Sequence, residues 1–358
     1  MFRASSNLPY CFMMNQHFPS PIDARPFTPA AATLWEPVWN LRVSLTPCER
    51  DLLDTWSLRR LNFVRTFGAG GLVMPTHHSR LSHVLGVLAL AAHFQPGNEA
   101  LRLAALLHDV GHGPFSHSLE SLPDFDHHQA GHELILGPEI GIILQRHGHD
   151  PAHIVALTGS KPPNPVRTEN DLLHLDHLDF FVRDPFACGW HTPPPAELLT
   201  RLTLDGPNVA TDLVTAEHLV ERILFENRLF VAPIKVAAEA ILERVVTLAS
   251  QKGIFDTEPH TIATMTDRDL LARLSGANDP EIEALLERLL HRPHTLHVRR
   301  VAAGEALLEG ALVVTFSKPY LGQPLVDGQP VGQVSERAAS MLAEARTLVG
   351  TFVVEPGA

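Results

Sequence analysis

The chain of 358 residues has few cysteines: Cys11, Cys48 and Cys188 are odd in number, widely spaced and never in a CxxC pair. This usage argues against a disulfide framework and against a zinc ribbon, and it indicates a reducing compartment. Long apolar runs are also missing, since runs such as residues 84–92 are too short to cross a bilayer. The N-terminus has no charged-then-apolar signal pattern. The sequence therefore predicts a cytoplasmic protein with no membrane segment.

An excess of positive charge is absent as well. The formal net charge is -12, so no global basic field attracts nucleic acid, and we expect none as a partner. Hydrophobic residues make up 45% and charged residues 19% of the chain, which is ordinary for a globular protein. This length can bury a large core, either in one domain with an appendage or in two domains.

The spacing of apolar residues predicts a mainly α chain with a smaller α+β C-terminal part. Residues 1–45 have no clear period, and we expect irregular structure or a short strand there. Residues 46–250 carry most of the helical patterns and form the predicted catalytic core. Residues 251–358 combine short helices near 267–274, 280–291 and 335–348 with strand-like runs at 295–302 and 311–316.

Two of the helical patterns contain specific signals. The spacing of Thr46 and Glu49 is that of a capping box, which predicts a helix that continues to about Val64. A second pattern covers residues 216–250 and contains Pro233, where we expect a kink.

Histidine is abundant, and 13 of the 22 histidines lie between residues 76 and 153. In this stretch an apolar helical pattern ends at His108 and Asp109, and the glycines at 111 and 113 indicate the helix end. Adjacent side chains on a helix point about 100° apart, so these two share an ion only at that end. Together with His83 and Asp176 they form a candidate ligand set for a divalent metal ion.

Neutral imidazoles and carboxylates suit Mn, Fe, Zn, Ni or Mg, and the set does not choose among them. Any one of these residues alone is more typical of a core histidine or a surface aspartate. The combination favours the metal site.

His117 and Glu120 are three residues apart, so the carboxylate can hold one imidazole nitrogen and direct the other toward a substrate. Such an oriented ring, with its pKa raised toward neutrality by the anion, is what a general acid requires. A solvated helix face is an equal alternative. Arg80, three residues before His83, suits a phosphate oxygen beside the metal, and otherwise is a surface arginine.

Three segments resemble the signature blocks of HD-domain phosphohydrolases: SRLSHVLG at 79–86, HDVGHGPFSH at 108–117 and LDHLDFFVRD at 175–184. They are similar to the blocks of the deoxynucleoside triphosphate triphosphohydrolase branch, although no sterile alpha motif is found. The resemblance covers residues 50 to 250 and implies an all-α HD core, a divalent metal cofactor, a deoxynucleotide substrate and a homo-oligomer. The metal ligands that it implies are His83, His108, Asp109 and Asp176.

The resemblance also implies roles for the neighbouring positions. Arg80 would contact the α-phosphate, and His117 would act at the leaving 5′ oxygen with Glu120 behind it. His127 would be a further active-site imidazole, and Asp184 would bind the 3′ hydroxyl of the sugar.

Several pocket positions depart from the pattern of the relatives. Thr66 replaces a glutamine that reaches the 3′ hydroxyl in the relatives. Phe67, the next residue, is a second candidate contact to the substrate. His177 replaces a lysine near the phosphates. Arg228 and Lys235 are weak candidates for the polyphosphate, and surface charges are the favoured interpretation of both.

The two pocket tyrosines of the relatives are also missing. Phe180 replaces one, and Phe230 is the nearest candidate for the other, since the chain has only Tyr10 and Tyr320. A lost hydroxyl removes about 0.5 to 1.5 kcal/mol where it made a hydrogen bond. Selection between deoxyribose and ribose is therefore expected to be looser.

The sequence thus predicts hydrolysis of dNTPs to deoxynucleoside and triphosphate. A metal-held water would attack the α-phosphorus, Arg80 and the ion would neutralise the developing charge, and His117 would protonate the leaving oxygen. One alternative is a 5′-nucleotidase or phosphomonoesterase of the HD type, and another is a non-catalytic regulator that binds metal or nucleotide. A third alternative is a metal ion with a purely structural role. Such sites usually have four protein ligands and lack a neighbouring general acid and arginine.

Overall fold

The computed structural model describes residues 33–74, 78–120, 122, 125–168, 171–255, 257–302, 304–307 and 311–356. Most of the predicted N-terminal segment lies outside these residues. Its described end forms an antiparallel hairpin of β1 (Thr33–Glu36) and β2 (Leu41–Ser44), so a short strand is the correct alternative there.

The predicted helix from Thr46 begins as expected but ends early. The capping box is present, because the backbone N–H of Glu49 donates to Thr46 Oγ1 and the N–H of Thr46 donates to Glu49 Oε2. Continuation to Val64 is wrong. Thr55 separates α1 (Pro47–Leu53) from α2 (Trp56–Arg59), because its hydroxyl donates to Leu52 O and accepts from the N–H of Leu58.

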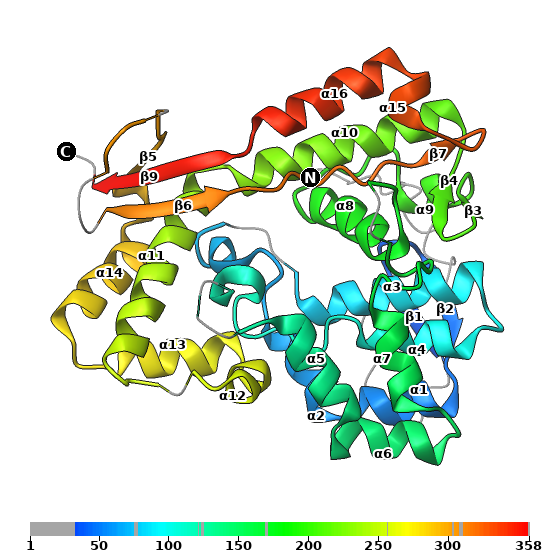
Figure 1. Cartoon of the computed structure of the whole chain (residues 1–358), viewed down its shortest axis with the longest axis horizontal. Helices are drawn as coiled ribbons and strands as arrows, with labels where there is room; N and C mark the ends of the chain where they lie inside the picture. Colours follow the sequence, from blue (N-terminus) through cyan, green and yellow to red (C-terminus); the bar gives the residue numbers. More distant parts are fainter. Residues whose placement is uncertain are drawn as a thin grey trace, which may run out of the picture.

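Six helices surround the histidine-rich stretch, and Figure 1 shows α3 beside α4 and α8. They are α3 (Arg80–Phe94), α4 (Glu99–Leu107), α5 (His127–Leu136), α6 (Pro138–Arg146), α7 (Pro151–Thr158) and α8 (Leu175–Ala187). Short 3-10 turns η1 (Arg60–Phe63), η2 (Gly68–Leu72) and η3 (Ser116–Leu119) connect this group. Helix α4 ends at Leu107, directly before the His-Asp pair, as the two glycines indicated.

The kink expected at Pro233 is a complete break. Helix α10 (Leu213–Phe230) ends, and α11 (Pro233–Gln251) begins with the proline in its first turn, where no N–H is required. Before α10 lie α9 (Pro195–Leu199) and the hairpin of β3 (Thr203–Asp205) and β4 (Asn208–Ala210).

The chain after residue 251 contributes to three separate parts of the fold: a group of helices, a sheet beside α11, and strands and helices beside α10. Helices α12 (Pro259–Thr264), α13 (Asp267–Ser275) and α14 (Pro280–His291) are followed by the turn η4 (Pro293–Thr295). An antiparallel sheet of order β5-β9-β6 contains β5 (Leu296–Arg300), β6 (Leu312–Phe316) and β9 (Gly350–Pro356) and lies against α11 (Figure 1). Strands β7 (Leu325–Val326) and β8 (Gln329–Pro330) join the β3-β4 hairpin, and α15 (Val331–Val334) and α16 (Glu336–Thr347) cover α10.

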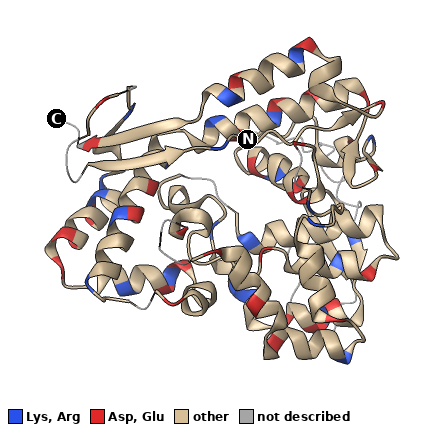
Figure 2. Ribbon diagram, in the orientation of Figure 1, with Lys and Arg blue, Asp and Glu red and all other residues tan. Residues whose placement is uncertain are grey.

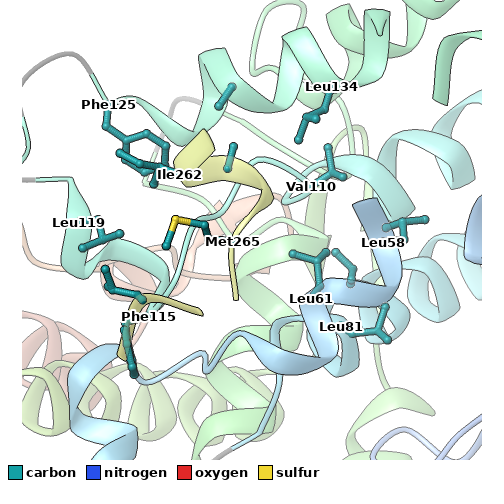
Figure 3. Packing of buried hydrophobic residues seen from close by; sticks show 14 of the residues in the cluster. Leu58, Leu61, Leu81, Val110, Phe115, Leu119, Phe125, Leu134, Ile262 and Met265 are labelled. Carbon is teal, nitrogen blue, oxygen red and sulfur yellow. The ribbon is translucent and has the colours of Figure 1, made fainter. Parts of the chain in front are cut away.

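One hydrophobic core joins helices α12, α13 and α14 to the N-terminal helices. Ile262 in α12 and Met265 just after it belong to the same buried cluster as Leu58, Leu61 and Val110, and Figure 3 shows Ile262 beside Phe125. This core therefore contains residues from both sides of position 250, where the sequence pattern suggested a boundary.

The prediction of a mainly α fold with a smaller α+β part is confirmed. Figure 2 shows acidic and basic positions interspersed along the same helices. Among the described residues, no helix combines the length and apolar character that a membrane span requires.

We predict that Glu49→Gln lowers the free energy of unfolding by about 3 to 5 kcal/mol, because it breaks a buried ion pair between α1 and α4. Glu49 is 0% exposed, and its carboxylate accepts two hydrogen bonds of 2.8 and 2.7 Å from Arg102. Urea denaturation at pH 7.5 measures the change. Glu99→Gln, in the first turn of α4 and at the surface, is the matched control and should shift the value by less than about 0.5 kcal/mol. Equal effects of the two variants would contradict the prediction.

Candidate metal centre and cleft

Four sequence-predicted ligands converge where α3, the end of α4 and the first turn of α8 meet. His83 Nε2 lies 3.3 Å from His108 Nε2 and 3.2 Å from an oxygen of Asp176. His108 Nε2 is 3.6 Å from the same oxygen of Asp176. The two oxygens of Asp109 lie 3.5 Å from His108 Nε2 and 3.6 Å from His83 Nε2.

The tautomers of the two histidines leave lone pairs at the centre of this group. His108 Nδ1 is 2.8 Å from the carbonyl of Ala105, and His83 Nδ1 is 2.8 Å from a carboxylate oxygen of Asp179. In the neutral form of each ring, Nδ1 therefore carries the proton and Nε2 is an acceptor. Two acceptor nitrogens facing each other and the carboxylates require a positive charge between them, so the residues present fit a divalent cation.

The pKa of His83 shows the same requirement. Burial alone lowers it, but hydrogen bonds with Asp176 and Asp179 outweigh burial and raise the pKa to about 9. Without a metal ion, a proton on His83 thus supplies the positive charge that balances the carboxylates.

Asp109 is held on the other side by cationic and polar groups. Arg80 donates to it at 2.9 Å, and His112 Nε2 lies 3.4 Å away. Burial would raise the pKa of Asp109, but His108, His112 and Arg80 keep it well below its ordinary value. Asp109 therefore stays ionised and connects the candidate metal centre to Arg80.

Asp179 orients His83 and is fixed by a buried network that the sequence did not assign. Trp39 Nε1 donates to it at 2.7 Å, and Arg183 donates to both of its oxygens at 2.8 Å. Arg183 in turn donates to Glu36 at 2.8 Å. A carboxylate behind a metal-binding imidazole fixes the ring and increases its basicity.

Gly86 makes room for this network. A Cβ atom at this position would overlap the carboxylate of Asp179 and the guanidinium of Arg183. Helices α3 and α8 therefore come close enough for Asp179 to reach His83 only because residue 86 has no side chain.

A second group of imidazoles lies beside the first. His117 Nδ1 and His127 Nδ1 lie 2.7 and 2.5 Å from the same oxygen of Glu120, so the predicted contact of His117 with Glu120 is present. The ring of His112 stacks on that of His127 with centroids 4.1 Å apart. Metal-binding atoms of these four side chains lie within 4.8 Å of one another.

The expected pKa of His117 is wrong in direction. Partial loss of water in the cleft, where 45% of the side chain remains exposed, lowers the pKa of this imidazole by more than the Glu120 carboxylate raises it. The sequence shows the neighbouring anion but not the loss of water. Burial would raise the pKa of Glu120, but hydrogen bonds with His117 and His127 hold it far below its ordinary range, so this carboxylate is ionised.

His83, Asp109 and Asp176 of the first group and all four side chains of the second line a cleft of about 670 Å³, which also contains basic and aromatic side chains. The lining includes Arg80, Arg167, His177, Phe180, Phe230, Lys318 and Tyr320. A second cavity of about 340 Å³ adjoins it. The residues common to both are Thr66, His117, Glu120, Phe230, Lys318 and Tyr320.

The predicted substrate contacts are divided between the cleft and its surroundings. Thr66, His177 and Phe180 line the cleft. Phe67 is 2% exposed and Asp184 is 1% exposed, and neither lines the two cavities. Both contact His78, because Phe67 meets its ring edge-on and Asp184 lies 2.5 Å from its Nε2.

The two weak polyphosphate candidates differ. Arg228 is exposed and pairs with Glu344 on α16, in agreement with a surface charge. The same interpretation is wrong for Lys235, which is 5% exposed, pairs with Glu239 at 3.2 Å and lines the smaller cavity.

Sequence reasoning missed several residues of the cleft, among them Arg167, Lys318 and Tyr320. The pocket does contain a tyrosine, since Tyr320 stacks on Phe230 with ring centroids 5.2 Å apart and an interplanar angle of 16°. Its ring centroid is 5.7 Å from that of Phe180. No local pattern around residue 320 indicated this position, because it follows β6 and reaches the cleft only through the tertiary fold.

Comparison with known proteins identifies the helical region. The family model of the HD domain matches residues 80–155. The uncharacterized protein MJ1154 of Methanocaldococcus jannaschii is 35% identical over 268 residues, which are 68% of this chain and 55% of that protein. A deoxynucleoside triphosphate triphosphohydrolase SAMHD1 homolog of Dictyostelium discoideum is 38% identical over 89 residues, which are 21% of this chain and 17% of that protein. The chain thus spans about half of the first relative and a smaller part of the second.

A solved structure supports the fold. The crystal structure of a phosphohydrolase from Bacteroides thetaiotaomicron superimposes with a TM-score of 0.65 at 18% identity and covers 91% of this chain and 100% of that one. At this identity the likeness concerns the fold.

We predict that Asp179→Asn weakens Mn²⁺ binding by about 10- to 100-fold, because it removes the anion that orients His83. Titration calorimetry of metal-free protein with MnCl2 measures the affinity, and circular dichroism checks the fold. Trp39→Phe, which removes only one hydrogen bond to Asp179, should give a smaller loss in the same direction. Asp205→Asn, at an exposed position in β3, is the control. Unchanged affinity in folded Asp179→Asn would show that this carboxylate does not support the metal centre.

Proposed function

Because the chain contains an HD domain and resembles the HD-domain phosphohydrolases, we propose that it is a metal-dependent phosphohydrolase that converts dNTPs to deoxynucleoside and triphosphate. One observation carries the proposal. The candidate metal centre, Arg80 and the imidazole group of His117, Glu120 and His127 all face one cleft. A structural metal site has no need of such an opening or of these neighbours.

The candidate metal centre fits a divalent ion, held by His83, His108, Asp109 and Asp176. Such an ion supplies positive charge to a phosphoryl oxygen and acidifies water at neutral pH. Arg80 lies beside it, fixed by Asp109, and its guanidinium offers donors to a phosphate oxygen. Charge that develops on the α-phosphate would therefore meet donors that are already in place.

His117 is the candidate proton donor to the leaving oxygen. Glu120 binds its Nδ1, so its Nε2 is the nitrogen free to face a substrate. Loss of water lowers its pKa, and a bound polyanion would favour the protonated ring. His127 shares the carboxylate and restrains Glu120 in this position.

The remaining walls suit a nucleoside polyphosphate. Arg167 and Lys318 add positive charge, which attracts phosphate groups. The rings of Phe180, Phe230 and Tyr320 offer flat apolar faces to a base or sugar. The volumes of the two adjoining cavities are in the range of ordinary ligand sites.

One observation favours a phosphomonoesterase as the second candidate. Burial lowers the pKa of His177 to about 4, so this ring is neutral at pH 7 and does not replace the charge of the lysine in the relatives. A monophosphate needs fewer cations than a triphosphate. The two candidates share the metal centre and differ in their products.

We predict that the purified protein with Mn²⁺ or Mg²⁺ releases intact triphosphate and deoxynucleoside from at least one of the four dNTPs. Asp109→Asn should lower the rate by at least about 10³-fold, because it weakens both the metal centre and the position of Arg80. Anion-exchange chromatography separates triphosphate, diphosphate and phosphate.

Asp205→Asn, which is remote from the cleft, should retain the rate of the unchanged protein. Release of phosphate alone from dNTPs or dNMPs would establish the phosphomonoesterase. A metal-loaded protein that is inert on every nucleotide would refute both and favour a non-catalytic binder.

A further inference from the structure

Residues 318–322, which we call the strap, form one wall of the cleft although they lie far from the HD helices in sequence. Lys318, Tyr320 and Gly322 all line the larger cavity. The strap follows β6, which ends at Phe316, and precedes β7, which begins at Leu325. It therefore crosses from the β5-β9-β6 sheet to the β3-β4-β7-β8 sheet over the mouth of the site.

The backbone of the strap is fixed to both sides of the cleft. Asn227 on α10 donates to Tyr320 O at 2.8 Å and accepts from the N–H of Tyr320 at 3.0 Å. Just beyond the strap, Gln323 accepts from the N–H of Leu173 at 2.8 Å and donates to Asp171 O at 3.1 Å. The second pair of bonds joins the segment that leads into α8 and Asp176. The distance between the strap and the candidate metal centre is thus set by hydrogen bonds.

The side chain of Tyr320 offers a hydroxyl to the cleft. Its ring is half-buried against Phe230 and Phe180, whereas its hydroxyl has no hydrogen-bond partner among the residues that the structure describes. Burial, with the nearby carboxylates of Glu120 and Glu226, raises the pKa of Tyr320 to about 12. The group is a neutral donor and acceptor at physiological pH.

Lys318 offers an uncompensated positive charge. Its side chain is exposed and makes no ion pair within the described part of the chain. The neighbouring cations differ, because Lys235 pairs with Glu239 and Arg228 pairs with Glu344. Of these three, Lys318 alone is ready to bind an anion.

We propose that the strap is part of the substrate site, where Tyr320 hydrogen-bonds the sugar and Lys318 binds the polyphosphate. This inference rests on the proposed function. Both residues lie where the two cavities meet, so a ligand that extends from the metal centre into the smaller cavity passes them. Tyr320 thereby supplies a hydroxyl that Phe180 and Phe230 lack, and Lys318 supplies a positive charge at the junction of the two cavities.

The test measures binding of two partial ligands to Mn²⁺-loaded full-length protein by titration calorimetry. The probes are inorganic tripolyphosphate and the best bound of the four 2′-deoxynucleosides. Tyr320→Phe should weaken the deoxynucleoside by about 3- to 10-fold and leave tripolyphosphate unchanged, since it removes one neutral hydrogen bond. Lys318→Met should weaken tripolyphosphate by at least about 10-fold and leave the deoxynucleoside unchanged, since it removes a charged partner.

Two further variants separate the strap from general effects. Arg228→Met removes the same charge on α10 outside the cleft and should change neither affinity. Asn227→Asp removes the hydrogen bond that Asn227 donates to Tyr320 O and places a carboxylate oxygen there, while the acceptor for the N–H of Tyr320 is kept. The strap loses one of its two bonds to α10, and both probes should bind more weakly. Tyr320→Phe keeps the ring stack with Phe230, so its fold is preserved.

The outcomes distinguish the two proposals. Unchanged affinities in Tyr320→Phe and Lys318→Met would overturn the inference while the phosphohydrolase stands. The expected pair of selective losses in a protein that hydrolyses no nucleotide would support the strap and refute the enzyme. A metal-loaded protein that binds neither probe would overturn both.

Discussion

The structure depends on the convergence of acceptor atoms from three helices on one point. Imidazole nitrogens of His83 and His108 and carboxylate oxygens of Asp109 and Asp176 can share a buried place only if a cation compensates them. The surroundings are arranged to maintain this group. Asp179, Arg183 and Glu36 form an ion network behind it, and Gly86 lets the two helices approach closely enough for the network to reach the ring.

The cleft divides its chemistry between two parts of the chain. Helices α3 and α8 and the turns after α4 contribute the charged groups that would act on a phosphate, namely the candidate metal ligands, Arg80 and the pair of His117 and Glu120. The opposite wall comes from α10 and the C-terminal strap, and its aromatic rings and its ammonium group suit recognition of the ligand. The groups that would act on a phosphate and the groups suited to binding the rest of a ligand therefore come from different segments of the chain.

The sequence predicted the features that depend on short spacing. The capping box at Thr46 and the helix end after Leu107 were readable because each is determined within a few residues. The four candidate ligands were proposed from short motifs, and the structure brings them together. The break at Thr55 was missed because the apolar pattern continues across it. A threonine hydroxyl can bond to a backbone carbonyl inside a helix or cap the start of a new one, and the sequence does not distinguish the two. Tyr320 was missed because its position depends on the path of a distant segment, and the pKa of His117 was wrong because loss of water is a property of the tertiary fold.

Asp184 matches the residue that binds the sugar in the relatives, but its surroundings in this structure are different. Asp184 agrees with the pattern of the relatives, but here His78 covers it and links it to Thr66, whose Oγ1 lies 3.1 Å from His78 Nδ1. Behind it lies Glu226, whose pKa is raised well above its ordinary value by burial and by Asp184, so a proton is retained between the two carboxyl groups. Asp184 is therefore engaged within the protein, and Thr66 is the member of this chain of contacts that reaches the cleft. Recognition of a sugar hydroxyl would then fall to the hydroxyl groups of Thr66 and Tyr320, which both line the cleft.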